Sequence, residues 1–197
     1  MSISAEQIKK LREMTGAGIL DTKRTLEEFN GDFEKALAVL KEKGMKVAEK
    51  KAERVAKQGL VETYVHAGGK IGVMVEVNCE TDFVAATNDF KELAHNIALQ
   101  IAATKPEFVS PNDISAEVIE EKKRAFHDAA IADGKPANII EKIVTGKLEA
   151  FYKESCLLRQ VFIRDDKQTV QDLIQATIAK VGENIVVKRF TRYELGA

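Results

Sequence analysis

IGVMVEVNC, residues 71–79, places an apolar side chain at every second position. A similar alternation runs through residues 60–65, and AGGK at positions 67–70 joins the two segments. A repeat of two is typical of a β-strand with one buried face, and paired glycines suit the tight turn of a hairpin. The stretch therefore predicts an antiparallel hairpin from Leu60 to Cys79 with one buried face.

Helical patterns follow the hairpin. Apolar residues trace a helical stripe from Phe90 to Ile101, and further helical patterns cover roughly residues 115–132 and 136–153. A strand that buries one face needs a helix or another sheet against it. We therefore expect these helices to cover the sheet.

Two further strands are expected around residues 157–163 and 185–193. Each carries apolar residues in both phases, which is typical of a sheet covered on both faces. Between them Thr169 caps a predicted helix whose apolar stripe ends near Val181. These elements predict an α+β core of antiparallel sheet and helices over residues 59–197.

The N-terminal segment reads as three short helices. Ser4 with Gln7 forms a capping box, so the first helix should begin at Ala5 and end near Thr15-Gly16. The second should end at Asn30-Gly31. Asp32 caps the third, which should end before Gly44, and we predict that residues 1–45 form a three-helix bundle. A bundle of this size is marginally stable alone.

A basic segment follows the bundle. Residues 41–57 hold seven Lys or Arg against three Glu, which suits either a solvated linker helix or a helix that binds phosphates. No aromatic residue that could stack on a base lies between Phe33 and Tyr64. We predict a linker helix over residues 46–58 and no nucleic-acid binding.

The composition indicates a folded cytoplasmic protein. The 197 residues include 30 Lys or Arg and 31 Asp or Glu, for a net charge of -1, so no global positive field would attract nucleic acid or a membrane. Two cysteines are too few for a disulfide framework, which favours a reducing compartment. No apolar run approaches the ~20 residues that cross a bilayer.

The sequence contains no recognisable catalytic or cofactor motif. TGAG at residues 15–18 lacks the preceding strand and the Gly-Lys-Ser/Thr of a phosphate loop, so we expect no direct nucleotide binding. His66, His95 and His127 are too scattered to predict a metal site. Cys79 and Cys156 lie in apolar strands, where a free thiol usually packs as a small apolar side chain. We therefore expect no enzyme, no cofactor and no metal.

The stretch ETDFVAA, residues 80–86, lies where the hairpin's second strand leads into the Thr87-capped helix. Physical reasoning alone favours Phe83 and Val84 packed under that helix. The alternative is that Phe83 projects, flanked by Asp82, as an anchor for a pocket on another protein.

Thr81-Asp82-Phe83-Val84 resembles the signature of the translation elongation factor Ts family. LREMTGAGILDTK, residues 11–23, is similar to the N-terminal motif of the same family. Later stretches also look familial, so the resemblance spans nearly the whole chain; they lie at residues 134–136, 146–148, 156–160, 165–170 and 192–196. The chain departs from the family pattern at Asp21, Thr25, Ala86 and Val161.

The resemblance implies an N-terminal bundle like a ubiquitin-associated domain. It also implies exchange of guanine nucleotide on elongation factor Tu, by disturbance of its magnesium and phosphate site. Asp82 and Phe83 would then press on the GTPase near the magnesium, while Thr81 and Val84 hold the turn. The bundle would dock through Arg12, Ile19, Leu20 and Lys23, with Thr15 and Gly16 shaping the turn between its helices.

Chain length adds one expectation. Longer members of the family have a second hairpin and a helical coiled-coil insertion, and we expect this short chain to lack both. A homodimer could supply the missing half, and His66 is a weaker candidate for a partner contact. The alternative to an exchange factor is an adaptor that binds another protein through the bundle without exchange activity.

Overall fold

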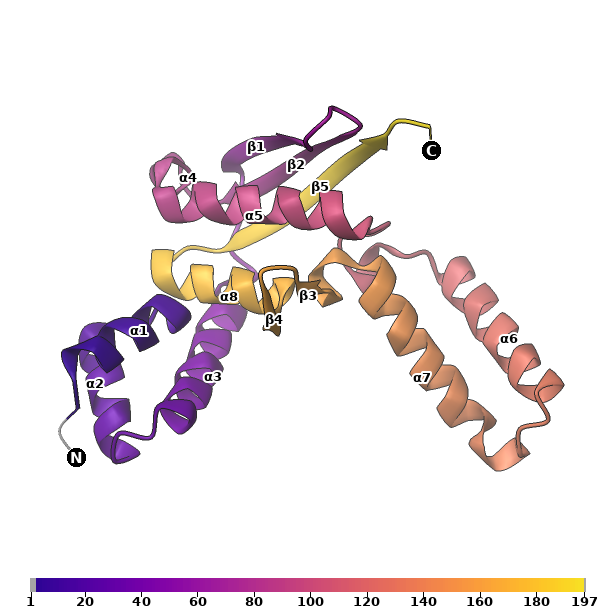
Figure 1. The fold of residues 1–197 in the computed structure, drawn as a ribbon, viewed down its shortest axis with the longest axis horizontal. Helices are drawn as coiled ribbons and strands as arrows, with labels where there is room; N and C mark the ends of the chain where they lie inside the picture. Colours follow the sequence, from indigo (N-terminus) through magenta and orange to yellow (C-terminus); the bar gives the residue numbers. More distant parts are fainter. Residues whose placement is uncertain (1–2, 197) are drawn as a thin grey trace.

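A computed structural model of the chain describes residues 3–196. Residues 1, 2 and 197, at the ends of the expected domains 1–45 and 59–197, lie outside the described part. Figure 1 shows three regions: N-terminal helices at one end, a layered centre of sheet and helices, and a helix pair that projects at the other end.

The N-terminal helices are α1 (Ala5–Thr15), α2 (Ile19–Glu28) and α3 (Phe33–Lys51). Ser4 and Gln7 form the predicted capping box, and the Asp32 side chain accepts a hydrogen bond from the Lys35 N–H at 3.1 Å. Apolar faces of the three helices enclose a small core of Leu11, Leu26, Ala36 and Leu40. The sequence therefore predicted the starts of the first and third helices correctly.

Helix α3 does not end before Gly44. It continues to Lys51, so the predicted boundary at residue 45 falls inside a helix, and residues 55–57 belong to no helix. A Cβ on Gly44 would lie 3.7 Å from the Cβ of Ala179, so this glycine faces helix α8 (Val170–Val181) closely instead of ending a helix. The expected linker helix over residues 46–58 is in its first part the end of α3.

The central sheet has three antiparallel strands in the order β1-β2-β5: β1 (Gln58–Val65), β2 (Ile71–Cys79) and β5 (Ile185–Glu194). The predicted hairpin is confirmed, with Leu60 opposite Val77. Helix α5 (Asn88–Thr104) lies along one face of the sheet, and α8 lies beneath α5 (Figure 1). The core packs β2 against these helices; its members include Val73, Val75, Val77, Cys79, Phe90, Ile97, Ile101 and Ile174.

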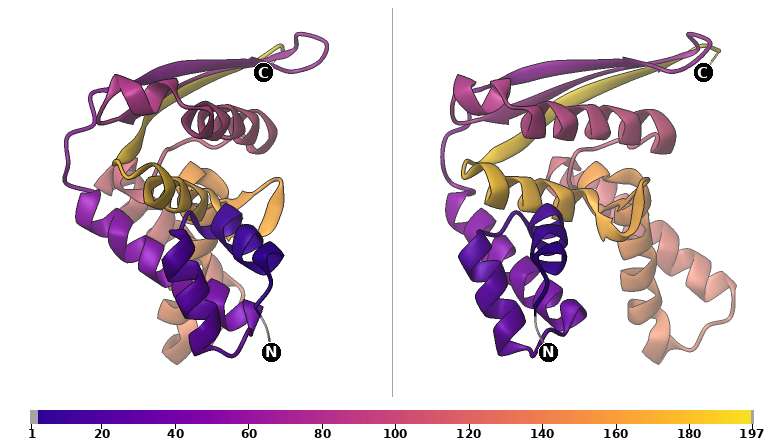
Figure 2. Two further views of the ribbon diagram at one scale, coloured as in Figure 1. Left: turned by 90° about the vertical axis from the view of Figure 1, so that its left-hand side faces the viewer. Right: turned by 60° about the vertical axis from the view of Figure 1, so that its left-hand side comes forward.

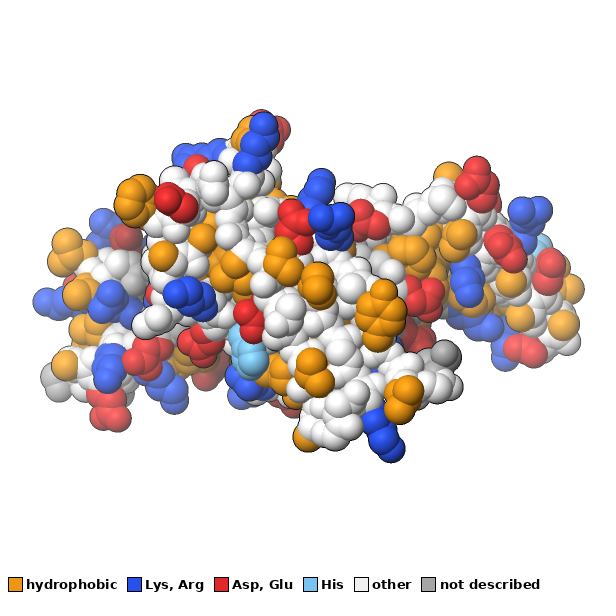
Figure 3. All heavy atoms as spheres, turned by 90° about the horizontal axis from the view of Figure 1, so that it is seen from above, with side chains coloured by type: hydrophobic (Ala, Val, Ile, Leu, Met, Phe, Trp, Pro, Cys, Tyr) orange, Lys and Arg blue, Asp and Glu red, His pale blue; other side chains and the backbone are white. Residues whose placement is uncertain are grey.

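The other face of the sheet is covered by none of the described helices and strands and is open (Figures 1 and 2), which corrects the expectation that both faces are covered. Val61, Val65, Met74 and Tyr193 are exposed there, and Figure 3 looks down on this face from above. Some apolar side chains of the strands therefore remain exposed to solvent in a single chain. The expectation was wrong because α5 and α8 stack on the same side.

Residues 157–163 form no strand of the central sheet. They make a 3-10 turn, η2 (Leu157–Arg159), and strand β3 (Val161–Phe162), which pairs only with β4 (Asp165–Thr169). The buried side chain of Gln100, on α5, donates to the Val161 carbonyl at 3.0 Å and accepts from the Ile163 N–H at 2.9 Å. A side chain thus satisfies backbone groups that a sheet neighbour would otherwise satisfy.

Helices α6 (Ala116–Ala132) and α7 (Ala137–Ser155) follow a short 3-10 turn, η1 (Pro111–Asp113). They form an antiparallel pair that projects away from the sheet (Figures 1 and 2). Their apolar stripes meet each other in a small separate core of Ala130, Ile140 and Val144. The expectation that these two helices cover the sheet was wrong, because they pack on each other.

Candidate functional site

The Phe83 side chain projects from a short helix at one end of the sheet. Strand β2 ends at Cys79, Thr81 caps helix α4 (Asp82–Ala86), and Phe83 is 82 % exposed. Val84 and Ala85 pack against the central core, so the opposite side of this single turn carries Phe83 outward. The interpretation that Phe83 packs under the next helix is therefore wrong, whereas Val84 does pack inward.

The turn before Phe83 is held by a carboxylate from a distant segment. Glu183 Oε2 accepts hydrogen bonds from the Glu80 and Thr81 N–H groups at 3.1 and 2.9 Å. Its Oε1 accepts from the Thr81 hydroxyl at 2.6 Å. The Cys79 thiol donates to the Thr81 carbonyl at 3.1 Å. Four polar contacts therefore fix the backbone from which Phe83 projects.

The same turn is connected to the end of α3. Glu80 Oε1 accepts from the Asn184 N–H at 2.7 Å. The Asn184 side-chain amide donates to the carbonyls of Ala52 and Arg54 at 3.3 and 2.9 Å. Asn184 is almost fully buried, so these contacts replace bonds to water. The end of α3, the α8–β5 turn and the β2–α4 turn form one hydrogen-bonded junction.

Sequence reasoning missed Glu183 and Asn184. Gly182 ends α8 in the left-handed conformation, as its sequence position suggests, but nothing in the sequence indicates which turn the next two side chains reach. They meet Glu80 and Thr81 only because Ile185 pairs with Cys79 in the sheet.

The proposed docking residues of the bundle divide into two groups. Ile19 and Leu20 begin α2, and Leu20 is 83 % exposed; Lys23 follows on the same helix, is exposed and lies 3.8 Å from Glu27. Arg12 is exposed on α1, and its Nε donates to the Ala17 carbonyl at 3.3 Å. These side chains are free to contact another molecule.

Thr15 and Gly16 are structural. The Thr15 hydroxyl, buried, donates to the Leu11 carbonyl at 2.6 Å and accepts from the Ala17 N–H at 3.3 Å. Gly16 has φ of +67°, and a Cβ there would lie 2.8 Å from the Ala176 carbonyl oxygen. Both residues therefore shape the turn between α1 and α2, and Gly16 also lets the bundle lie close to α8.

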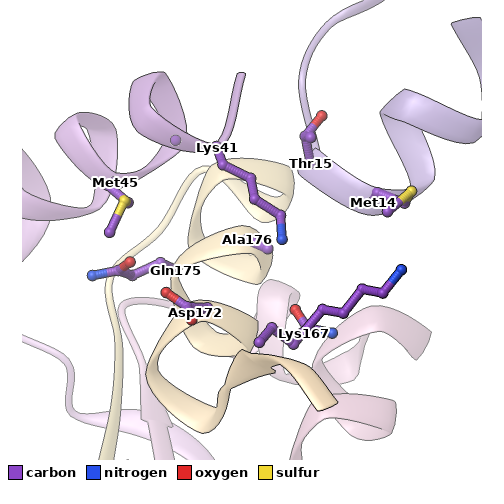
Figure 4. A pocket seen from close by; sticks show the side chains of 10 residues that line it. Met14, Thr15, Lys41, Met45, Lys167, Asp172, Gln175 and Ala176 are labelled. Atoms are coloured by element: carbon purple, nitrogen blue, oxygen red, sulfur yellow. The ribbon is translucent and has the colours of Figure 1, made fainter. Parts of the chain in front are cut away.

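A cavity of about 200 Å³ lies beside this contact, between the bundle and the core. Figure 4 shows Met14 from α1, Lys41 and Met45 from α3, and Gln175 and Ala176 from α8 around it. The Gln175 side-chain oxygen is buried without a hydrogen-bond partner. Next to the close backbone contact at Gly16, this cavity therefore separates the bundle from helix α8.

The structure places the candidate residues on three separate surfaces. The α4 turn and the bundle lie at the same end of the molecule, away from the projecting helices (Figures 1 and 2). His66 lies at the other end of the hairpin, about 25 Å along β2 from Thr81. Its Nδ1 is 3.0 Å from the Tyr64 hydroxyl oxygen. His66 therefore does not join the Phe83 surface.

The two cysteine thiols, both within the described residues, are not activated as nucleophiles. Burial, with the nearby charge of Glu183 as the second cause, raises the pKa of the Cys79 thiol. Burial also raises the pKa of the Cys156 thiol, so both remain protonated at neutral pH. Within residues 3–196 no cluster of His, Cys, Asp or Glu has the arrangement of a metal site. In the same range no helix is both long and apolar enough to cross a membrane.

Comparison with known proteins gives a consistent result. The family model described as "Elongation factor TS" matches residues 3–197. The chain is 59 % identical over 196 residues to "Elongation factor Ts" of Thermotoga maritima, covering 100 % of this chain and 98 % of the relative. It is 58 % identical over 196 residues to the protein of that name from Coprothermobacter proteolyticus, with both chains fully covered. With Carboxydothermus hydrogenoformans the identity is 55 % over 194 residues, or 98 % of this chain and 89 % of the relative. The chain therefore belongs to the elongation factor Ts family.

Proposed function

We propose that the chain is a guanine-nucleotide exchange factor for elongation factor Tu and acts in the cytoplasm during translation elongation. It binds the GDP-bound GTPase and promotes GDP release by disturbing the magnesium and phosphate site. The work is done by binding, and no residue of this chain carries out a chemical step.

One observation carries the proposal: an 82 % exposed phenylalanine projects from a turn held by four polar contacts. An exposed aromatic ring is costly in water unless a partner covers it, and rigid aromatic anchors dominate the energy of many protein interfaces. Asp82, exposed beside Phe83, adds a negative charge next to the inserted ring. Such a pair suits a wedge that competes with a metal and phosphate site.

The bundle supplies a second contact. Ile19 and Leu20 are large apolar side chains exposed at the start of α2, with Lys23 on the same helix. Arg12 adds a positive charge on α1. We propose that this surface docks on the GTPase and brings Phe83 to its site. If factor and GDP each weaken the other's binding, linkage makes the antagonism reciprocal, so that incoming nucleotide displaces the factor.

The test is the release of a fluorescent GDP analogue from purified elongation factor Tu, with excess unlabelled nucleotide. We expect substoichiometric amounts of this chain to accelerate release with turnover. Binding to the GTPase without faster release would favour an adaptor that acts through the bundle, and the exchange proposal would fail.

We propose in addition that two copies pair through the open face of the sheet. Met74 lies near its middle and is half exposed, with Val61 and Tyr193 on neighbouring strands. A second copy would cover this apolar surface with an identical one, as a two-fold interface requires.

Light scattering coupled to size exclusion tests this pairing. We expect a mass of twice 21.8 kDa for the chain, and a single-copy mass for Met74→Lys because two charges would then be buried at the interface. Ile131→Lys, at an exposed apolar position on the projecting pair, is the control and should keep the mass unchanged. A single-copy mass for the unchanged chain would refute the dimer.

A further inference from the structure

We propose that Glu183 is a positioning residue for exchange: its carboxylate holds the turn that points Phe83 at the partner. The inference rests on the proposed function, because it assigns to Glu183 the orientation of the exchange element. Glu183 itself is half-buried and bonds to the turn that precedes α4, so it acts through Thr81 and Glu80 instead of contacting the partner.

The geometry assigns this role specifically. Both oxygens of one carboxylate are used, one on two consecutive N–H groups and the other on the Thr81 hydroxyl. The Thr81 hydroxyl in turn accepts from the Val84 N–H at 3.4 Å, so it caps α4 while it donates its own hydrogen bond to Glu183. Hydrogen bonds to an ionised acceptor are stronger than neutral ones. Thr81 thus passes the constraint from Glu183 to the helix that carries Phe83.

Helix α4 needs such a constraint. It has only five residues, and a single helical turn is not stable on its own. Val84 and Ala85 pack inward, but Phe83 has little contact with the rest of the chain. Without the carboxylate, the exposed ring could sample many directions, and only a fraction of them would fit a pocket. Among complexes docked through the bundle, the share in the productive pose would fall to that fraction, and the maximal release rate would fall with it.

The junction also relates Phe83 to the bundle. Gly182 and Asn184, on either side of Glu183, bind the end of α3: the Lys51 ammonium donates to the Gly182 carbonyl, and Asn184 donates to Ala52 and Arg54. The residue that orients Phe83 is therefore fixed to the helix that leaves the bundle. The Phe83 surface and the docking surface of the bundle therefore keep a fixed position relative to each other.

The experiment compares Glu183→Ala with Glu183→Gln in the nucleotide-release assay over a range of factor concentrations. We expect Glu183→Ala to lower the maximal release rate by about tenfold. The concentration for half-maximal effect should change by less than about twofold, since the bundle still docks. Glu183→Gln should recover most of the rate, because its carbonyl can still accept from both N–H groups and its amide can donate to the Thr81 hydroxyl.

The matched control is Asp172→Ala. Asp172 makes contacts of the same kind at the other end of α8, accepting from the Thr169 N–H and hydroxyl, both at 2.8 Å. It should lower the melting temperature comparably and leave the maximal rate unchanged. Equal slowing by Asp172→Ala and Glu183→Ala, or an unchanged rate with Glu183→Ala, would overturn the inference.

A direct measurement separates this inference from the proposed function. The chain has no tryptophan, so Phe83→Trp introduces a single reporter at the site. Its fluorescence anisotropy decay should show restricted local motion when Glu183 is present and wider motion in the Phe83→Trp, Glu183→Ala double variant. Equal motion in both would refute positioning even if exchange is confirmed. Restricted motion without any stimulated release would instead refute the exchange function alone.

Discussion

Replacing Phe83 by alanine should slow exchange strongly and leave the fold intact. Aromatic side chains bury at least about 150 Å² in an interface, and Phe83 is 82 % exposed, so about 120 Å² is available for a partner to cover. At ~25 cal/mol per Å² this corresponds to about 3 kcal/mol, or about a hundredfold in the rate of GDP release if the contact forms in the release step. The same exposure means that the free energy of unfolding should change by less than about 0.5 kcal/mol.

The assay is release of a fluorescent GDP analogue at saturating factor, with melting temperature measured in parallel. Leu195→Ala is the matched control, since Leu195 is also a large apolar side chain, 77 % exposed, beyond the opposite end of β5 from the Phe83 turn. It should release GDP at the unchanged rate. An undiminished rate for Phe83→Ala would remove Phe83 from the mechanism. A large fall in melting temperature would show that the ring supports the fold.

Three further outcomes are expected. Gly16→Ala should cost at least about 1 kcal/mol, a fall of about 3 °C in melting temperature, because φ is +67° and the new Cβ would lie against α8; an unchanged melting curve would contradict this. Leu20→Asp should weaken binding to the GTPase about thirtyfold at constant melting temperature, as measured by calorimetry, since burial of a leucine is worth about 2 kcal/mol; equal affinity would exclude it from docking. Hydrogen bonds from Lys105 and then Arg192 lower the pKa of Glu194, so its stabilising effect should be present at neutral pH and lost as the pH falls below the ordinary value of 4.5. The melting temperatures of the chain and of Glu194→Gln should therefore differ at pH 7 and converge in acid; a constant difference would refute the linkage.

Local chemistry made much of the fold predictable. Capping residues such as Ser4, Asp32 and Thr169 act within three or four positions of themselves, so the helix starts could be read from the sequence. The hairpin was predictable for the same reason, because alternation and a glycine turn are properties of one continuous stretch. The role of Gly44 was not predictable, since its contact with Ala179 depends on a helix that lies 135 positions later in the chain.

Long-range relations account for the other errors. The apolar stripes of α6 and α7 fit a partner helix as well as a sheet, and the sequence does not say which they meet. Likewise, the phase of residues 157–163 resembled a core strand, but Gln100 takes their backbone groups. At the candidate site, the sequence singled out Phe83 and Leu20 but could not show that both are exposed. It gave no signal for Glu183, whose target lies about a hundred residues earlier.

The close packing of Gly16 on α8 has a consequence for how two weak contacts could add up. A flexible link between the bundle and the core would let the second surface search a large volume after the first has docked. Because Gly16 has no side chain, its backbone lies directly against helix α8, and the bundle cannot slide along the core without a steric clash. This contact keeps the searched volume small. Docking of one surface then presents the other at a high effective concentration, and the gain comes without any additional contact to the partner.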